Sequence, residues 1–524
     1  MLRSYFYQQS LLEVDPDEIC LGRTSFERGL RDLLPRLLSV DDFTALHPSA
    51  AGAPTCDPMV LAGMLLLQFR FGLSDEALIE RCRRDLGFRY ALGLERGVAP
   101  PGVASLKRFR KAVRELKGAD WFFRLSVRLA VEASLASPDE LQGIDSTNTD
   151  QRGATLDTYN LVATAIGQVV RRMAAVLGRG PRDLAKEWDA TRYLARSIKG
   201  GAAIDWSDEA ERNTFVTSEI SDAERVARLA EQAGVALPDD VSEAIALMRQ
   251  VAYQDVEKLP DGTFAIAQRT APGRIVSTTD PEARHGRKSS SKAITGFKTH
   301  VLGTLDSQFV TAIDVTGANV HDAVPTRGLL GQAETVGLKP KDAVGDNAYG
   351  TGANRRVCDE LGVTLHTKLA TPSHTGFTKR DFVIDLVAMS VTCPNNVTTT
   401  TYSDVKDPGG SADRVAKFRF SPSDCRECPL REQCSTVTAA GRGRSVVLNR
   451  FENEIQEAQR MNAQPAEKSI LRKRSAIERL IAHLVRMGMR QARFFGLAMV
   501  RFQAFMTAAA YNLQRYITLA AAVA

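Results

Sequence analysis

The order of strand and helix patterns between residue 139 and the end of the chain constrains the fold most. A short strand pattern at 139–146 is followed, after a long helical stretch, by two strands around a turn at 305–308, which is a hairpin signature. A helix, a strand ending at Asp346, a second helix, an extended segment and a last helix containing Glu478 complete the order. This order predicts a mixed sheet with an antiparallel hairpin, flanked by helices.

The same order is typical of a ribonuclease-H-like α/β domain, here interrupted by two insertions. Residues 161–274 are helical, and residues 381–450 are rich in Thr, Ser, Asp, Gly and Cys, which suggests short strands and turns. An all-helical domain at 1–118 precedes the α/β core. The predicted core therefore consists of residues 139–160, 275–375 and 465–524.

Length and composition agree with several globular domains. The chain has 524 residues, of which 25% are charged and 44% hydrophobic, and this balance excludes a disordered or collagen-like chain. At roughly 100–200 residues per domain, the length predicts about three or four domains. The net charge of +6 is only mildly basic and by itself establishes no nucleic-acid partner.

No targeting or membrane segment is expected. The first 18 residues lack the apolar stretch of a signal peptide, and the longest apolar stretch, 494–513, is interrupted by Arg501, Gln503 and Asn512. Eight cysteines are too sparse for a secreted disulfide scaffold. We therefore expect a cytoplasmic protein.

Two features of the N-terminal helical domain point towards DNA. A helix opened by Pro58, a break at Gly72 and a helix capped by Ser74 have the spacing of a helix-turn-helix. After a Pro-Pro-Gly break, Ser105 is the predicted cap of a basic helix. From charge alone this helix fits either DNA contact or a solvated surface. Its basic residues are Lys107, Arg108, Arg110, Lys111, Arg114 and Lys117.

Three carboxylates stand at positions suited to metal chemistry. Asp145 and Asp346 each close an apolar strand pattern, and Glu478 lies one helical turn after Arg474. Three converging carboxylates can hold two divalent cations about 4 Å apart for displacement at phosphorus, and Mg²⁺ prefers such oxygen ligands. The alternative is structural, because aspartates at strand ends commonly serve as turn or capping residues.

Several phrases of the sequence, taken in order, resemble a bacterial insertion-sequence DDE transposase. GIDSTN and VGDNAYG resemble the strands with the first and second aspartates, and RKRSAIERL resembles the glutamate helix. DPEARHGRK…GFKTHV and AIDVTGANVHD resemble the blocks between them, and SLKRFRKAVRE resembles part of the preceding helical domain. The resemblance covers nearly the whole chain.

The resemblance implies roles for particular residues. Asp145, Asp346 and Glu478 match the three ligands of two Mg²⁺ or Mn²⁺ ions, and Tyr349 and Arg474 match positions that handle DNA. Two positions depart from the family pattern: Leu471 stands where a tyrosine is expected, and Val485 stands where a lysine is expected. Arg486 is the basic residue nearest to that second position.

The implied activity is cleavage of element ends, after which the freed 3′-hydroxyl attacks target DNA. The implied partner is double-stranded DNA, bound by a homodimer, and the implied location is the bacterial nucleoid. Two other classes remain open: a ribonuclease-H-like nuclease without strand transfer, and a non-catalytic DNA-binding descendant of a transposase.

Charge concentrates at the C-terminal end. Residues 465–524 contain ten lysines and arginines but two acids, a net charge of +8. Arg472, Arg479, Arg486 and Arg493 recur every seven residues, which predicts one stripe along a helix if that helix continues past Gly488. Such a stripe can follow a phosphate backbone, or it can be a solvated face.

Four cysteines form a second constellation. Cys393, Cys425, Cys428 and Cys434 are separated by 31, 2 and 5 residues, and they can supply four thiolates to a structural Zn²⁺. Their segment has few apolar residues from which to build a core, which favours a bound metal that stabilises it. The spacing also resembles a cysteine block of some insertion-sequence transposases. Free thiols are the alternative.

Three other residues fit a structural role as well as a functional one. Asp322, in the loop after the third strand, can approach the metals or act as a turn residue. Trp188 and Trp206 in the helical insertion fit core packing better than a role in holding a flipped base.

Overall fold

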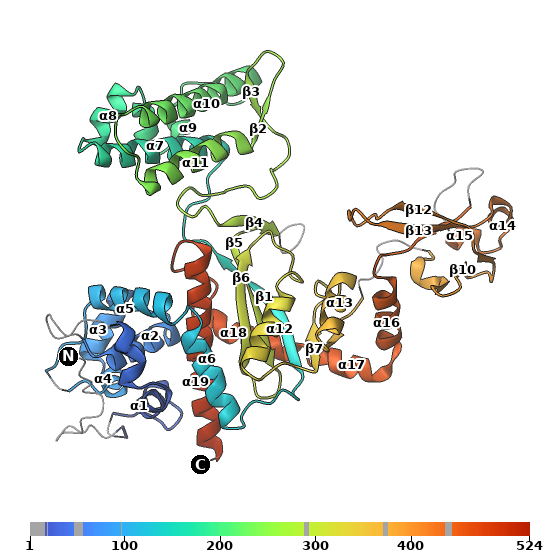
Figure 1. The fold of residues 1–524 in the computed structure, drawn as a ribbon, viewed down its shortest axis with the longest axis horizontal. Coiled ribbons are helices and arrows are strands. Elements are labelled where there is room, and N and C mark those ends of the chain that lie inside the picture. Colours follow the sequence, from blue (N-terminus) through green and yellow to red (C-terminus); the bar gives the residue numbers. More distant parts are fainter. Residues whose placement is uncertain are drawn as a thin grey trace.

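A computed structural model describes residues 16–17, 19–46, 56–95, 97–287, 293–369, 376–434 and 443–523. Figure 1 shows four bodies: a helical N-terminal part, a central sheet with its helices, a helical insertion, and a small β-rich part. The C-terminal helix returns to lie between the N-terminal part and the sheet.

The N-terminal part contains helices that mostly begin where the sequence places a cap. Ser25 caps the first helix and Ser74 caps the third through bonds to backbone N–H groups. The predicted cap at Ser105 is wrong: the basic helix begins at Val103, because Gly102 takes the extended conformation of an N-cap after the two prolines. The helices are α1 (Phe26–Leu37), α2 (Pro58–Arg70), α3 (Asp75–Arg84), α4 (Leu86–Leu92), α5 (Val103–Leu116) and α6 (Trp121–Glu132).

The central sheet is mixed, as predicted, and is compatible with a ribonuclease-H-like core. Its strands are β1 (Gln142–Asp150), β4 (Arg284–Arg287), β5 (Ala293–Thr304), β6 (Val310–Gly317), β7 (Asp342–Gly345) and β8 (Thr364–His366). The order is β6-β5-β1-β7-β8, and β4 pairs with the first residues of β5. Pairs β6–β5 and β5–β1 are antiparallel, whereas β1–β7 and β7–β8 are parallel. Helix α12 (Thr326–Thr335) lies between β6 and β7 in the chain, and α13 (Gly352–Glu360) connects β7 to β8.

Two glycines let helix α18 (Ser475–Arg486) approach the sheet closely. A Cβ at Gly143 of β1 would lie 2.6 Å from the Cβ of Ile477, and one at Gly303 of β5 would lie 2.9 Å from Leu480. The buried face of α18 comprises Ala476, Ile477, Leu480, Ile481 and Leu484. This buried face packs on β1 and β5, which brings the first turn of α18 beside the strand that carries Asp145.

The C-terminal helix α19 (Leu497–Val523) joins the N-terminal part to the sheet. It packs on β6 and on α2 and α6, so one continuous apolar core extends from the N-terminal helices to the sheet. Two carboxylates cap its start: Asp280 accepts from the N–H of Gly496 (3.1 Å) and Glu282 from that of Leu497 (2.7 Å). Negative charge at a helix N-terminus is favourable.

The helical insertion has an apolar core of its own. It is built from α7 (Thr158–Val176), α8 (Pro181–Glu187), α10 (Glu209–Glu231) and α11 (Asp239–Gln254), with short α9 (Ile198–Gly201) and a hairpin of β2 (Val256–Lys258) and β3 (Phe264–Ile266). Trp188 is buried in this core and Trp206 packs at its edge. Within the described residues no single helix is long and apolar enough to span a membrane; only α7 and α8 together, bent by 112°, reach that length and composition.

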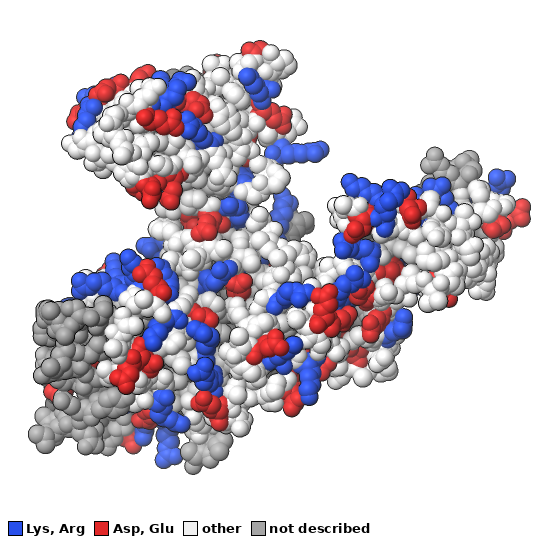
Figure 2. Space-filling model, viewed as in Figure 1, with Lys and Arg blue, Asp and Glu red and all other residues white. Residues whose placement is uncertain are grey.

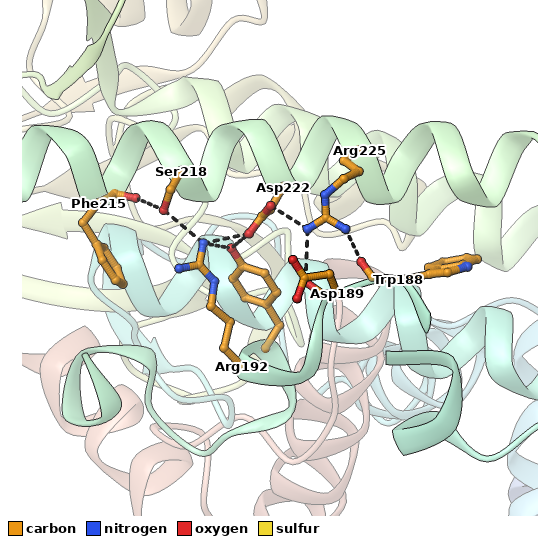
Figure 3. Close-up of polar contacts among 8 residues, drawn as sticks. Trp188, Asp189, Arg192, Phe215, Ser218, Asp222 and Arg225 are labelled. Carbon is orange, nitrogen blue, oxygen red and sulfur yellow. Dashed lines mark hydrogen bonds and ion pairs between the residues drawn. The ribbon is translucent and has the colours of Figure 1, made fainter. Parts of the chain in front are cut away.

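A polar network fastens the segment after α8 to α10 (Figure 3). Asp222 of α10 accepts hydrogen bonds from the Tyr193 hydroxyl (2.7 Å), Arg192 (2.7 Å) and Arg225 (2.6 Å). Arg225 also donates to the carbonyl oxygens of Trp188 and Asp189. Burial works against the charge of Asp222, but the hydrogen bonds and the two guanidinium groups together hold its pKa below the ordinary value. The network therefore stabilises the insertion.

Glu219 is an unsatisfied acid inside the same insertion. Its side chain is fully buried on α10, and neither carboxyl oxygen has a hydrogen-bond partner among the described residues. Burial raises its pKa from 4.5 to about 9; the nearby charges are Arg192, Asp157 and Asp222. The carboxyl is therefore protonated at neutral pH in the folded chain and ionised in the unfolded chain.

We expect Glu219→Gln to make the insertion less sensitive to alkaline pH. Between pH 4.5 and 9 the folded wild type holds a proton that the unfolded chain has lost, so its free energy of unfolding falls as pH rises. The substitution should reduce the stability lost between pH 5 and pH 8 by roughly 4 kcal/mol. Urea unfolding followed by the fluorescence of Trp188 and Trp206 measures this loss. Glu209→Gln, an exposed change on the same helix, is the control and should leave the loss unchanged.

The cysteine-rich segment folds into a small β-rich part. Its strands form two three-stranded sheets, one of β9 (Val383–Asp385), β10 (Ser390–Thr392) and β11 (Thr398–Thr399), the other of β12 (Tyr402–Lys406), β13 (Arg414–Arg419) and β14 (Ser445–Val447). Short helices α14 (Pro422–Arg426) and α15 (Arg431–Cys434) follow β13. The core contains Phe382, Phe418 and Phe420, so the segment buries more apolar surface than its composition suggested. Helices α16 (Glu452–Ala463) and α17 (Pro465–Arg472) lead back to the sheet.

Candidate active site

Asp145 and Asp346 lie side by side where two parallel strands separate. Ile144 of β1 pairs with Gly345, the last residue of β7, and Asp145 and Asp346 are the next residues along the chain. The expectation that Asp145 ends its strand is wrong, because β1 continues to Asp150 through its pairing with β5. Asp145 instead follows the last β1 residue paired with β7, so the two acids still meet at one edge of that pair.

Arg474 links Glu478 to the first aspartate. Its guanidinium lies 2.6 Å from Oε1 of Glu478 and 3.7 Å from Oδ2 of Asp145. Asp145, Asp346, Glu478 and Arg474 all line one cleft of about 470 Å³. The structure thus brings the three carboxylates predicted from sequence to a common cleft, from β1, from the end of β7 and from the first turn of α18.

The charge of Asp145 reflects its neighbours. Burial, together with the negative charges of Asp346 and Glu478, raises its pKa from 3.8 to about 6, against the opposing effects of the Ser146 N–H and Arg474. Concentrated negative charge in a partly buried cleft favours the uptake of cations. The oxygen donors suit Mg²⁺ or Mn²⁺.

Cations and a fourth acid complete the cleft. Asp322 lies 3.1 Å from the Lys298 ammonium and accepts a hydrogen bond from the Ser146 hydroxyl (3.1 Å). Arg287 and Arg490 also line the cleft. The sequence did not decide whether Asp322 has a structural or a functional role, and it did not predict that Lys298, Arg287 and Arg490 line the cleft. The nearest hint of these three cations came from the basic segments that resemble the family.

Arg490 reaches the cleft through backbone pairing with β1. The N–H of Asp150 donates to the carbonyl of Arg490 (2.7 Å), and the N–H of Ala492 donates to that of Asp150 (2.9 Å). The segment after α18 therefore runs along the end of β1. This places an arginine on the cleft, although Val485 replaces the lysine of the family pattern.

Tyr349 does not lie on the DNA-facing surface that the resemblance implied. Its side chain is completely buried, and burial, together with the charges of Asp145, Asp322 and Asp346, raises its pKa well above the ordinary value. The ring packs with Ile144 and Leu302 in the apolar cluster beneath the cleft. Tyr349 therefore supports the cleft from below.

Only some of the basic side chains predicted to contact DNA from helix α5 lie on the surface. Arg110 is buried and bonds to Asp75 (2.5 Å) and to Gln68 (3.1 Å), so it joins α5 to α2 and α3 and is not on the basic surface. Lys107, Arg108 and Lys111 of this helix are exposed. Figure 2 shows Lys and Arg gathered where α5 lies on the N-terminal part.

The predicted stripe of four arginines is interrupted at both ends. Helix α17 ends at Arg472, and α18 ends at Arg486, before Gly488, whose φ of +97° breaks the helix. Arg493 lies half-buried over the ring of Phe69 (5.1 Å). Arg479 and Arg486 remain exposed on α18.

The four cysteines of the β-rich part line a single pocket of about 280 Å³. None of the four forms a disulfide bond with a described residue. Burial raises the pKa of Cys434, and the other three cysteines also act to raise it. Four sulfur donors around one pocket suit zinc. Across the described residues, neither this pocket nor the acidic cleft holds three or more His, Cys, Asp or Glu side chains already arranged around a metal position.

Comparisons with known proteins concern two segments. Residues 392–517 match the family model described as "Transposase DDE domain", and residues 18–112 match "Transposase domain (DUF772)". The first segment contains Arg474 and Glu478, whereas Asp145 and Asp346 lie outside both. No curated protein matches the chain. The two matches confirm the resemblance to an insertion-sequence DDE transposase.

Proposed function

We propose that this chain, an insertion-sequence DDE transposase with two transposase domains, cleaves DNA at element ends and joins the freed 3′-hydroxyl to target DNA. One observation carries the proposal: carboxylates from three separate elements line one cleft, and Arg474 bridges two of them. The sheet order β6-β5-β1-β7-β8 supports a ribonuclease-H-like core.

The proposal gives roles in this reaction to seven residues of the cleft. Asp145, Asp346 and Glu478 would hold two Mg²⁺ or Mn²⁺ ions, which would activate water and stabilise charge at phosphorus. Arg474 orients the carboxylates of Asp145 and Glu478 before the ions bind. The cations of the cleft, Lys298, Arg287 and Arg490, attract the phosphate backbone to the acids.

Cleavage can be tested on a plasmid that carries the gene with its flanking DNA. We expect cuts at two short inverted repeats in Mg²⁺, with free 3′-hydroxyl ends, and no cuts in EDTA. A protein that binds these ends tightly yet cuts nothing in Mg²⁺ or Mn²⁺ would be the non-catalytic descendant of a transposase.

The DNA surface is proposed to include two exposed basic faces. One is the α5 face with Lys107, Arg108 and Lys111, and the other is the α18 face with Arg479 and Arg486. We propose that a homodimer brings two such surfaces to two element ends, in the cytoplasm of a bacterium. Because insertion elements have two ends, a two-fold assembly matches the substrate.

We expect Arg479→Gln together with Arg486→Gln to weaken binding to any DNA sequence. Each lost phosphate contact lowers the slope of log K against log salt by about 0.9, so the slope should fall by about two. Equilibrium binding to a duplex from 50 to 300 mM KCl gives this slope. Arg182→Gln with Arg196→Gln, two exposed arginines of the helical insertion, is the control. An equal fall in the control would mean that only general charge matters.

The cysteine pocket is proposed to hold one structural Zn²⁺. Cys425 and Cys428 would hold the ion from one turn, and Cys393 and Cys434 would complete four sulfur ligands. With all four positions filled by protein, the ion would be structural and not catalytic.

A further inference from the structure

A second, basic pocket opens on the other side of Asp346. It has a volume of about 660 Å³ and shares Asp346 and Arg474 with the acidic cleft. Its other charged lining residues are Lys368, Lys468 and Arg472. Four cations thus face a single acid, whereas the neighbouring cleft holds four acids.

The three additional cations are available to a ligand. Lys368, Lys468 and Arg472 are exposed, and none of them forms an ion pair with a described residue. The Arg474 guanidinium, in contrast, is engaged by Glu478 and Asp145. Unpaired cations that converge on one hollow favour an anion with several negative oxygens, such as phosphate.

A buried contact anchors the two chain segments that carry the lysines. His366 at the end of β8 bonds through Nδ1 to Glu467 of α17 (2.8 Å) and through Nε2 to Asp342 (3.0 Å). His366 and Glu467 are both buried. Lys368 follows His366 by two residues and Lys468 follows Glu467 directly, so the contact that holds α17 on β8 also brings the segments that carry both lysines to one pocket.

The lining distinguishes a phosphate backbone from a free nucleotide. No aromatic side chain stands among the described residues that line the pocket, so it offers no face on which a base can stack. Its wall with the acidic cleft is formed by Asp346 and Arg474. A strand whose phosphate lies at the acids therefore has a basic path past Asp346.

We propose that Lys368, Lys468 and Arg472 form a flanking-phosphate pocket, which binds the backbone of the DNA strand next to the phosphate that is cut. The inference rests on the proposed function for the position of the cut phosphate. The binding itself requires only DNA, and neither metal nor cleavage.

Salt-dependent binding in EDTA tests the pocket on the full-length protein. For Lys368→Gln, Lys468→Gln and Arg472→Gln combined, we expect the slope of log K against log KCl to fall by about two to three. Lys468→Gln alone should lower it by about 0.9. Lys473→Gln is the matched control, because Lys473 is exposed on the same segment and lines neither pocket, and it should leave the slope unchanged. An unchanged slope in the triple variant, or an equal fall for Lys473→Gln, would overturn the proposal.

Neutralising single phosphates locates the contact on DNA. A methylphosphonate scan of a cleavable end should weaken wild-type binding at one or two positions beside the cut, and the triple variant should lose no further affinity there. Equal losses in both proteins at every position would overturn the proposal. A protein that shows the expected salt slopes yet never cuts DNA would support the pocket and contradict the cleavage reaction. Normal cleavage together with unchanged salt slopes would support the cleavage reaction and contradict the pocket.

Discussion

Asp346→Asn is expected to abolish DNA cleavage and leave DNA binding nearly unchanged. The substitution keeps the size of the side chain but removes a negative charge from the centre of the acidic cleft, so the cations that activate water are no longer held. Ligands that act as a unit cannot replace one another, and the expected loss of cleavage rate is at least about 10³-fold. Cleavage of a labelled element end in Mg²⁺ measures the rate, and binding in EDTA measures affinity.

The control for this change is Asp306→Asn. Asp306 is exposed in the hairpin between β5 and β6 and lies outside the cleft, so its loss should alter neither cleavage nor binding. Cleavage by the Asp346→Asn protein at more than about a tenth of the wild-type rate would contradict the assignment of Asp346 as a metal ligand.

Removing two cysteines together should have the second large effect. Purified wild-type protein is expected to contain about one zinc per chain, and Cys425→Ser with Cys428→Ser should contain none. Zinc binding contributes roughly 10 kcal/mol or more to folding in small metal domains. Among its described residues the β-rich part has an apolar core of seven buried side chains, and this core is small, so the part should become sensitive to protease without zinc.

Cys20→Ser with Cys56→Ser is the matched control, since neither cysteine lines the pocket. It should keep both the zinc and the protease resistance. Freshly purified, reduced wild-type protein without stoichiometric zinc would rule out the structural metal and favour free thiols.

Local patterns in the sequence predicted the elements that carry the acids. The strand that ends beside Asp346 follows from its pattern of apolar residues, and the start of α3 after Ser74 follows from cap chemistry. These signals depend on residues only a few positions apart. The order of elements then restricted the sheet to a mixed arrangement, which the structure has.

Long-range contacts explain what the sequence could not predict. Arg110 has the charge of its neighbours on α5, but its partner Asp75 lies 35 residues earlier, and this ion pair takes it out of the basic surface. Asp145 lies inside β1 because β5, some 150 residues later, continues to pair with it. Arg490 reaches the cleft through pairing with Asp150, which no local pattern indicates.

Strand joining in a purified system tests the central proposal most directly. A labelled element end with a free 3′-hydroxyl is incubated with the full-length protein, a target plasmid and Mg²⁺, and the products are separated on a denaturing gel. The proposal predicts that the label becomes covalently joined to the plasmid, that EDTA prevents joining, and that Asp145→Asn and Glu478→Gln each prevent it. Mg²⁺-dependent cutting of the end with no joined product at any target concentration would contradict it, and would identify a nuclease without strand transfer.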